Sequence, residues 1–155
     1  MSRVVMLCGP AGAGKSTLAR QLEAEGCVRL SIDAEAWARG HRGMPIPPEA
    51  QAEIVADLQD RLLALIREGR DAVLDMSFWS RAMRDEWRAL LAPTGTVPEL
   101  VHLVAERSTA LARVAARSTG HADDFPLAPA LAAAYYDGFE PPEPDEGPVV
   151  VVRTG

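Results

Sequence analysis

The feature that most constrains the fold is a glycine-rich stretch, GPAGAGKST, at residues 9–17. It comes directly after an apolar run and directly before a stretch with helical periodicity. The pattern G-x-x-x-x-G-K-[ST] turns consecutive backbone N–H groups inward around a phosphate, where a buried strand leads into the N-terminus of a helix. The stretch therefore predicts a strand, a phosphate-binding turn and a helix, in that order.

Apolar runs alternate with helical periodicity along the rest of the chain. We expect a short helix after Asp33, strands at 3–8, 27–32, 71–75, 99–105 and 148–152, and longer helices at 16–25, 49–67, 80–91, 108–117 and 128–136. Strands this apolar, separated by helices, indicate a parallel sheet that is covered on both faces. With 155 residues, the chain is long enough for one domain, so we predict a single α/β domain at 1–155.

Lys15 is the only lysine among the 16 basic residues of the chain. Its compact ammonium can reach the β- and γ-phosphates of a nucleotide inside the loop, where the planar fork of arginine would not fit. The Ser16 hydroxyl would ligate Mg²⁺. Because the guanine-reading motif N-K-x-D does not occur in the sequence, we expect the nucleotide to be ATP. The predicted nucleotide-binding residues of the loop are Gly9, Pro10, Ala11, Gly12, Ala13, Gly14, Lys15, Ser16 and Thr17.

Charge and hydropathy exclude some other classes of protein. A formal net charge of −6 argues against a broad surface for nucleic acid or anionic lipid. Every apolar run is shorter than the roughly 18 residues that a membrane span needs. Cys8 and Cys27 lack the spacing of metal ligands, so we predict buried thiols in a reducing compartment and a cytoplasmic location.

Three further stretches extend the pattern: SIDAEAW at 31–37, DMSFWSRAMRDEWR at 75–88 and ARVAAR at 112–117. Together with the glycine-rich loop, they resemble the small P-loop kinases that include chloramphenicol phosphotransferase, zeta-toxin-like kinases and the kinase domains of polynucleotide kinases. The resemblance implies a doubly wound, five-stranded parallel sheet of order 2-3-1-4-5 with a small helical lid at about 106–127. It also implies an acceptor site beyond the carboxyl ends of the strands.

The resemblance assigns roles to the residues at the ends of two strands. Asp33 would accept the proton of an attacking hydroxyl, although an aspartate there could instead cap the following helix. Asp75 would face Mg²⁺ or the substrate, or else simply end its strand. The residues expected to form a wall of the substrate pocket are Phe78, Trp79, Arg81 and Arg84. The alternative is that the aromatic pair belongs to the core and the arginines are solvated.

Arg113 and Arg117 are four residues apart and so share one helical face. The resemblance implies that Arg113 lies near the adenine and that Arg117 acts on the transferring phosphate, where a fixed charge stabilises the transition state. The alternative is a surface helix with salt bridges. FEPPEPDEG at 139–147 would be a loop near the base of ATP or a stiff connection to the last strand.

These residues favour an ATP- and Mg²⁺-dependent kinase that acts on a small-molecule hydroxyl, as a monomer or a homodimer. The acceptor could be an antibiotic, a sugar, a nucleoside or a sugar nucleotide. One alternative is a nucleic-acid 5′-hydroxyl kinase, which would need a basic groove. A second alternative, of another class, is a regulatory module that binds ATP without catalysis.

Overall fold

All five described strands run parallel in one sheet of order β2-β3-β1-β4-β5. The computed structural model describes residues 2–43, 45–116 and 127–154. The strands are β1 (Val4–Cys8), β2 (Val28–Ser31), β3 (Ala72–Asp75), β4 (Glu99–Val104) and β5 (Val149–Arg153). Each lies within a residue or two of its predicted position, and the predicted strand order is confirmed.

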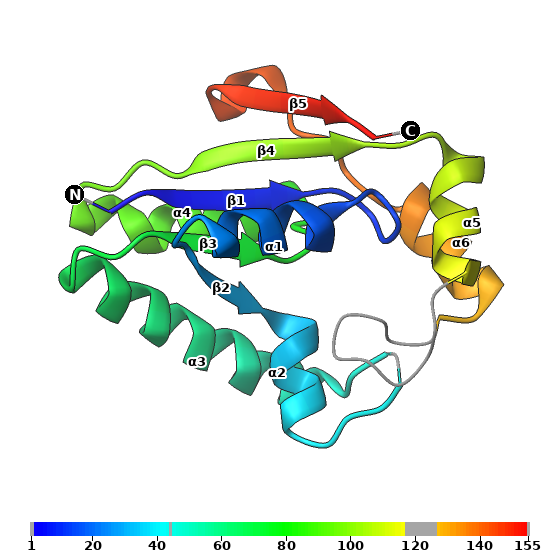
Figure 1. Cartoon of the computed structure of the whole chain (residues 1–155), viewed down its shortest axis with the longest axis horizontal. Coiled ribbons are helices and arrows are strands. Elements are labelled where there is room, and N and C mark those ends of the chain that lie inside the picture. Colours follow the sequence, from blue (N-terminus) through cyan, green and yellow to red (C-terminus); the bar gives the residue numbers. More distant parts are fainter. Residues whose placement is uncertain (1, 44, 117–126, 155) are drawn as a thin grey trace.

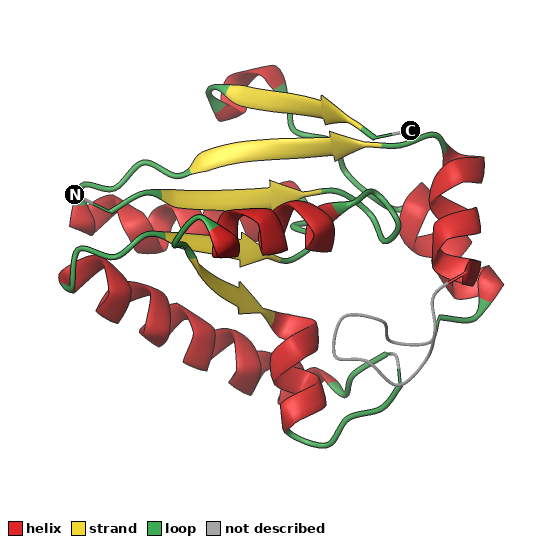
Figure 2. Ribbon diagram, viewed as in Figure 1, coloured by secondary structure: helices red, strands yellow, loops and turns green. Residues whose placement is uncertain are grey.

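Helices cover both faces of the sheet (Figure 1). They are α1 (Lys15–Ala24), α2 (Ile32–Ala38), α3 (Pro48–Arg67), α4 (Arg81–Leu91), α5 (Arg107–Ala116) and α6 (Pro129–Asp137). Single turns of 3₁₀ helix follow α4 at Ala92–Thr94 and precede β5 at Pro144–Glu146. In Figure 2, α2, α5 and α6 gather at the carboxyl ends of the strands, which is where a doubly wound sheet binds ligands.

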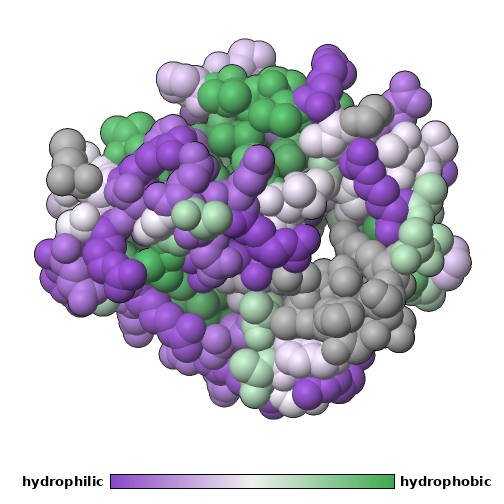
Figure 3. Space-filling model, viewed as in Figure 1, coloured by the Kyte–Doolittle hydropathy of each residue, from purple (hydrophilic) through white to green (hydrophobic). Residues whose placement is uncertain are grey.

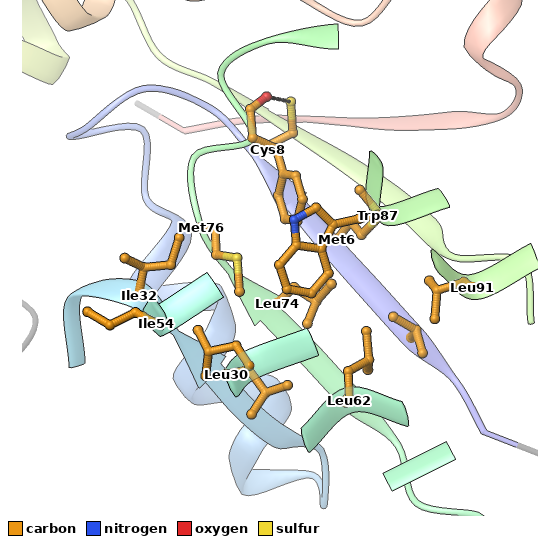
Figure 4. Close-up of a cluster of buried hydrophobic side chains, with 14 of the residues drawn as sticks. Met6, Cys8, Leu30, Ile32, Ile54, Leu62, Leu74, Met76, Trp87 and Leu91 are labelled. Carbon is orange, nitrogen blue, oxygen red and sulfur yellow. Dashed lines mark hydrogen bonds between the residues drawn. The ribbon is translucent and has the colours of Figure 1, made fainter. Parts of the chain in front are cut away.

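Alternate residues of β1 supply two separate cores, because successive side chains of a strand point to opposite faces. Val4, Met6 and Cys8 pack with α3 and α4, in the cluster that Figure 4 shows in close-up. Val5 and Leu7 pack on the other face with α1. A strand that is buried on both faces in this way must be apolar throughout, which explains the unbroken run VVMLC.

The last strand, β5, is the least covered part of the sheet. Val150 and Val151 are exposed, and Figure 3 shows apolar surface gathered at this edge. Both cysteines are buried and free, as predicted. Within the described residues, no helix is both long and apolar enough to cross a membrane.

Candidate active site

The glycine-rich loop joins β1 to α1 and depends on glycine at particular positions. Gly12 and Gly14 have φ angles of 85° and 102°, in the left-handed region. A Cβ atom on Gly12 would lie 2.3 Å from the carbonyl oxygen of Ala110, so no larger residue fits there. Gly14 occupies the N-cap of α1, and a helix N-terminus preceded by glycine in this way favours a bound phosphate. Lys15 folds back over the loop, where its Nζ donates to the Pro10 carbonyl oxygen at 3.0 Å.

The loop is also held from outside by α5 and the end of β5. Arg113 donates to the carbonyl oxygen of Gly12 at 3.1 Å and to both oxygens of Thr154 at 2.9 Å. The Thr154 hydroxyl in turn donates to the Ala13 carbonyl oxygen at 2.7 Å. Arg113 therefore contacts the loop itself. Thr154 could not be predicted from the sequence, because this contact joins residues 141 positions apart.

Asp75, at the end of β3, lies beside the start of α1. Its Oδ2 accepts a hydrogen bond from the Ser16 hydroxyl at 3.3 Å. The same oxygen accepts from Arg29 Nε of β2 at 2.9 Å, and the Asp75 side chain is only 4% exposed. Arg29 was not among the residues predicted from the sequence. Its signal is that it is the one charged residue in the strand VRLS.

Hydroxyl and carboxylate oxygens such as those of Ser16 and Asp75 suit Mg²⁺, which commonly takes one or two protein ligands and otherwise phosphate and water oxygens. The described residues contain no cluster of three or more His, Cys, Asp or Glu placed to hold a metal ion. A magnesium ion at this position would therefore share its coordination between these two side chains and the nucleotide. The residues present fit that arrangement.

Asp33 lies in the first turn of α2, two residues after the N-cap position. The N-cap is Ser31, whose hydroxyl accepts a hydrogen bond from the Ala34 backbone N–H at 3.1 Å. The alternative that Asp33 caps the helix is thus wrong. The register of the sheet pairs Ser31 with Asp75, so the chain emerges from β2 next to the end of β3.

A cavity of about 610 Å³ opens at the carboxyl ends of the strands. Its phosphate end is lined by Pro10, Ala11, Lys15 and Ser16 of the loop, and both Asp33 and Asp75 also line it. The structure thus brings the loop and the two predicted carboxylates together around one space. Beyond them, the lining is mostly apolar and comes from the segment after β3, the turn before α3, and α6.

The predicted pocket wall at 78–84 divides into two parts. Trp79 lines the cavity and is 53% exposed. Phe78, however, is fully buried, and its ring lies edge-on against Trp87 at a centroid distance of 5.8 Å. Phe78 therefore belongs to the core.

Arg84 is not part of the pocket wall either, because its side chain is completely buried. It forms two hydrogen bonds with the Glu146 carboxylate, at 2.7 and 3.0 Å, and donates to the carbonyl oxygens of Phe78 and Glu140. Arg81 instead pairs with Asp145 at 2.7 Å, outside the described cavity lining. The two arginines thus hold the 139–147 segment against α4, rather than contacting the cavity.

Burial by itself would raise the pKa of Glu146, but hydrogen bonds from Arg84, the Glu143 backbone N–H and Arg88 outweigh that effect and lower the pKa to about 2. The carboxylate is therefore charged at neutral pH although it is buried. Glu146 was not predicted from the sequence as the partner of Arg84.

Arg117 lies outside the described residues, as do the residues at 118–126 of the predicted lid. Both predictions therefore stay as they were.

One family model and one relative of known name match the sequence. A family model described as "AAA domain" matches residues 4–142. A shikimate kinase from Chromohalobacter salexigens is 34% identical over 111 residues, which are 70% of this chain and 61% of that protein. The match thus spans about three fifths of the length of this relative.

Among solved structures, a sugar kinase from a Janibacter species is 24% identical, with a TM-score of 0.70 and coverage of 99% of this chain and 86% of that one. A gluconokinase from Sinorhizobium meliloti is 23% identical, with a TM-score of 0.68 and coverage of 97% and 82%. At these identities, the two structures show that the fold is shared.

Proposed function

The chain belongs to the AAA-domain family of P-loop proteins, and on that premise we propose that it is an ATP-dependent kinase that transfers the γ-phosphate of ATP to a hydroxyl group of a small molecule. One observation carries the proposal. Lys15 and Ser16 of the loop and the carboxylates Asp33 and Asp75 all line the same cavity. The kinase names of the shikimate kinase and gluconokinase relatives support the same reaction class.

The phosphate end of the cavity would hold the nucleotide. Backbone N–H groups of the loop and the Lys15 ammonium bind the phosphates, and Ser16 and Asp75 supply oxygen ligands for Mg²⁺. Bound Mg²⁺ neutralises phosphate charge and so assists the transfer. Arg29 keeps the Asp75 carboxylate beside Ser16 through its 2.9 Å hydrogen bond, so that Asp75 does not have to be ordered when the ligand binds.

Asp33 is proposed as the general base. The acceptor hydroxyl gives its proton to the Asp33 carboxylate as its oxygen forms a bond to the γ-phosphorus, and the bond from that phosphorus to the leaving oxygen of ADP breaks. Because Ser31 already caps α2, the Asp33 side chain is not required to begin the helix. It also lines the cavity, where an acceptor would lie.

The test is Asp33→Asn, which keeps the size of the side chain and removes its basicity. We expect phosphoryl transfer to fall by about 10²-fold or more, with ATP affinity and melting temperature unchanged. The matched control is Glu35→Gln, because Glu35 is the other acidic residue in the first turn of α2 and pairs with Arg39 and Arg61 instead of lining the cavity. Single-turnover transfer from labelled ATP to a panel of hydroxyl compounds measures the effect. Normal transfer by the Asn variant would rule out Asp33 as the base.

Two finer predictions from the sequence remain proposals. One is the narrower relationship to chloramphenicol phosphotransferase and zeta-toxin-like kinases. The other is the organisation of the chain as one domain with a lid at about 106–127.

A further inference from the structure

Two aromatic side chains are exposed inside the same cavity. Trp79 is 53% exposed and Tyr135 is 37% exposed, and both line the 610 Å³ space. A tryptophan has more apolar surface to bury than any other side chain, so leaving half of it open to water costs stability unless a ligand covers it. The position of Trp79 in a concave site, not on a convex surface, points to a ligand as that cover.

The backbone that carries Trp79 is fixed on both sides. The preceding Phe78 has a φ of 46°, a left-handed conformation that is strained for a bulky residue and that tends to occur at ligand sites. The Phe78 carbonyl oxygen accepts from buried Arg84 at 2.8 Å, and the Trp79 carbonyl oxygen accepts from the Glu140 N–H at 2.8 Å. These contacts hold the backbone at residues 78 and 79. The Phe78 ring lies in the core, and the Trp79 side chain lines the cavity. A backbone held in this way does not have to be ordered when a ligand packs on the Trp79 ring.

In the described lining, the charged side chains are Lys15, Asp33 and Asp75, and Asp75 is already paired with Arg29. The rest of the described lining is mostly apolar and includes Ile32, Ile46, Met76 and Met83. Besides the Ser16 hydroxyl of the loop, its polar groups include the amide of Gln51 and the hydroxyls of Ser77 and Tyr135. A carboxylate on the acceptor would lose its hydration against this wall and would be repelled by Asp33.

From this lining, we propose that the acceptor is an uncharged alcohol with a hydrophobic ring, which packs on Trp79 while its hydroxyl meets Asp33. The inference rests on the proposed kinase function and narrows it to one substrate class. It sets this chain apart from relatives whose names specify shikimate or gluconate, because both of these substrates are acids. The amide of Gln51 and the hydroxyl of Ser77 would bond polar groups of the same molecule.

The experiment compares two sets of acceptors with the full chain, MgATP and a label on the γ-phosphate. The uncharged set is phenylethanediol and phenyl glucoside, and the acidic set is gluconate and shikimate. We expect kcat/KM for the uncharged set to exceed that for the acids by at least about tenfold. Binding of ATP is measured by calorimetry in the same preparation.

Trp79 is tested with two substitutions and one control. Trp79→Ala should raise KM for the ring-bearing alcohols by about tenfold, with a smaller effect on kcat and none on KM for ATP, and Trp79→Phe should restore most of the loss. The control is Val97→Ala, because Val97 is an exposed apolar residue. It lies just before β4, at the amino ends of the strands and so away from the cavity. Preferred transfer to the acids would overturn the inference and leave the kinase function standing. Failure to phosphorylate any of the four compounds, with ATP bound, would count against both.

Discussion

Glu146→Gln should destabilise the protein strongly, because Glu146 is the counter-ion of a buried arginine. Its carboxylate and the Arg84 guanidinium are both fully buried, and Arg88 donates to the same carboxylate at 3.0 Å. Glutamine has nearly the same size and can still accept a hydrogen bond, but it leaves Arg84 as a buried charge without compensation. The substitution therefore removes the negative charge of the pair while the volume of the side chain stays nearly the same.

The magnitude follows from the pKa of Glu146, which is about 2 in the folded protein against the usual 4.5. At 1.36 kcal/mol for each pKa unit, this difference corresponds to about 3 kcal/mol of stability at neutral pH. Breaking a buried ion pair by removing one partner generally costs about 3–5 kcal/mol. Both routes lead us to expect a loss of about 3–5 kcal/mol in the free energy of unfolding.

Urea unfolding followed by circular dichroism measures that loss, and its dependence on pH tests the cause. The pKa of Glu146 is lowered on folding, so its stabilising effect is fully present above the usual pKa of 4.5 and is lost as the pH falls toward about 2. The difference between wild type and Glu146→Gln should therefore stay constant from neutral pH to about pH 5 and shrink below it.

The matched control is Asp85→Asn in the same group of charges. Asp85 also accepts a hydrogen bond from Arg88, but its side chain is 53% exposed, and an exposed ion pair contributes only about 0–1 kcal/mol. If Glu146→Gln lost no more stability than Asp85→Asn, or if its deficit did not change with pH, the buried ion pair would not be what holds the 139–147 segment.

Two further predictions concern the phosphate loop. Lys15→Ala should abolish transfer and weaken ATP binding in calorimetry with little change in melting temperature, and unchanged ATP affinity in the folded variant would contradict the loop's assignment. Thr154→Val removes the hydroxyl that donates to the Ala13 carbonyl oxygen at 2.7 Å, so it should weaken ATP binding several-fold and cost about 1 kcal/mol of stability. The control is Thr94→Val, because the Thr94 hydroxyl makes a comparable bond to the Leu91 carbonyl oxygen away from the loop, and equal ATP affinity in both threonine variants would show that Thr154 does not support the site.

The strands and helices were predictable because their signals are local. A fully apolar run such as VVMLC, followed by the glycine-rich loop and a helix, can form few structures other than a buried parallel strand at the centre of an α/β sheet. The order of the five strands came instead from the resemblance to P-loop kinases. Asp33 and Asp75 were noticed because they lie at the ends of two predicted strands, and their roles came from the same resemblance.

The pocket wall at 78–84 was predicted only in part, because the paths of Phe78 and Trp79 depend on a backbone conformation. A left-handed φ at a bulky residue is uncommon, and the identity of the residue does not predict it. The burial of Arg84, by contrast, is indicated by the sequence. Arg84, Trp87 and Leu91 have the spacing i, i+3, i+7, so the arginine lies on the buried face of α4. Its partner, 62 residues away, could not be found from spacing.

Two arginines hold parts of the site in place, Arg84 with a fully buried side chain and Arg29 with one that is only 12% exposed. Arg84 uses its whole guanidinium, since Nε and Nη2 bond Glu146 while Nη1 bonds the carbonyl oxygens of Phe78 and Glu140. One side chain thereby joins α4, the segment that carries Trp79 and the connection before β5. Arg29 acts similarly on the other side of β3, where it joins β2 to Asp75. A lysine ammonium is a point charge and cannot reach several acceptors in a fixed plane. The same property that excludes arginine from the position of Lys15 thus makes it the suitable residue behind the site.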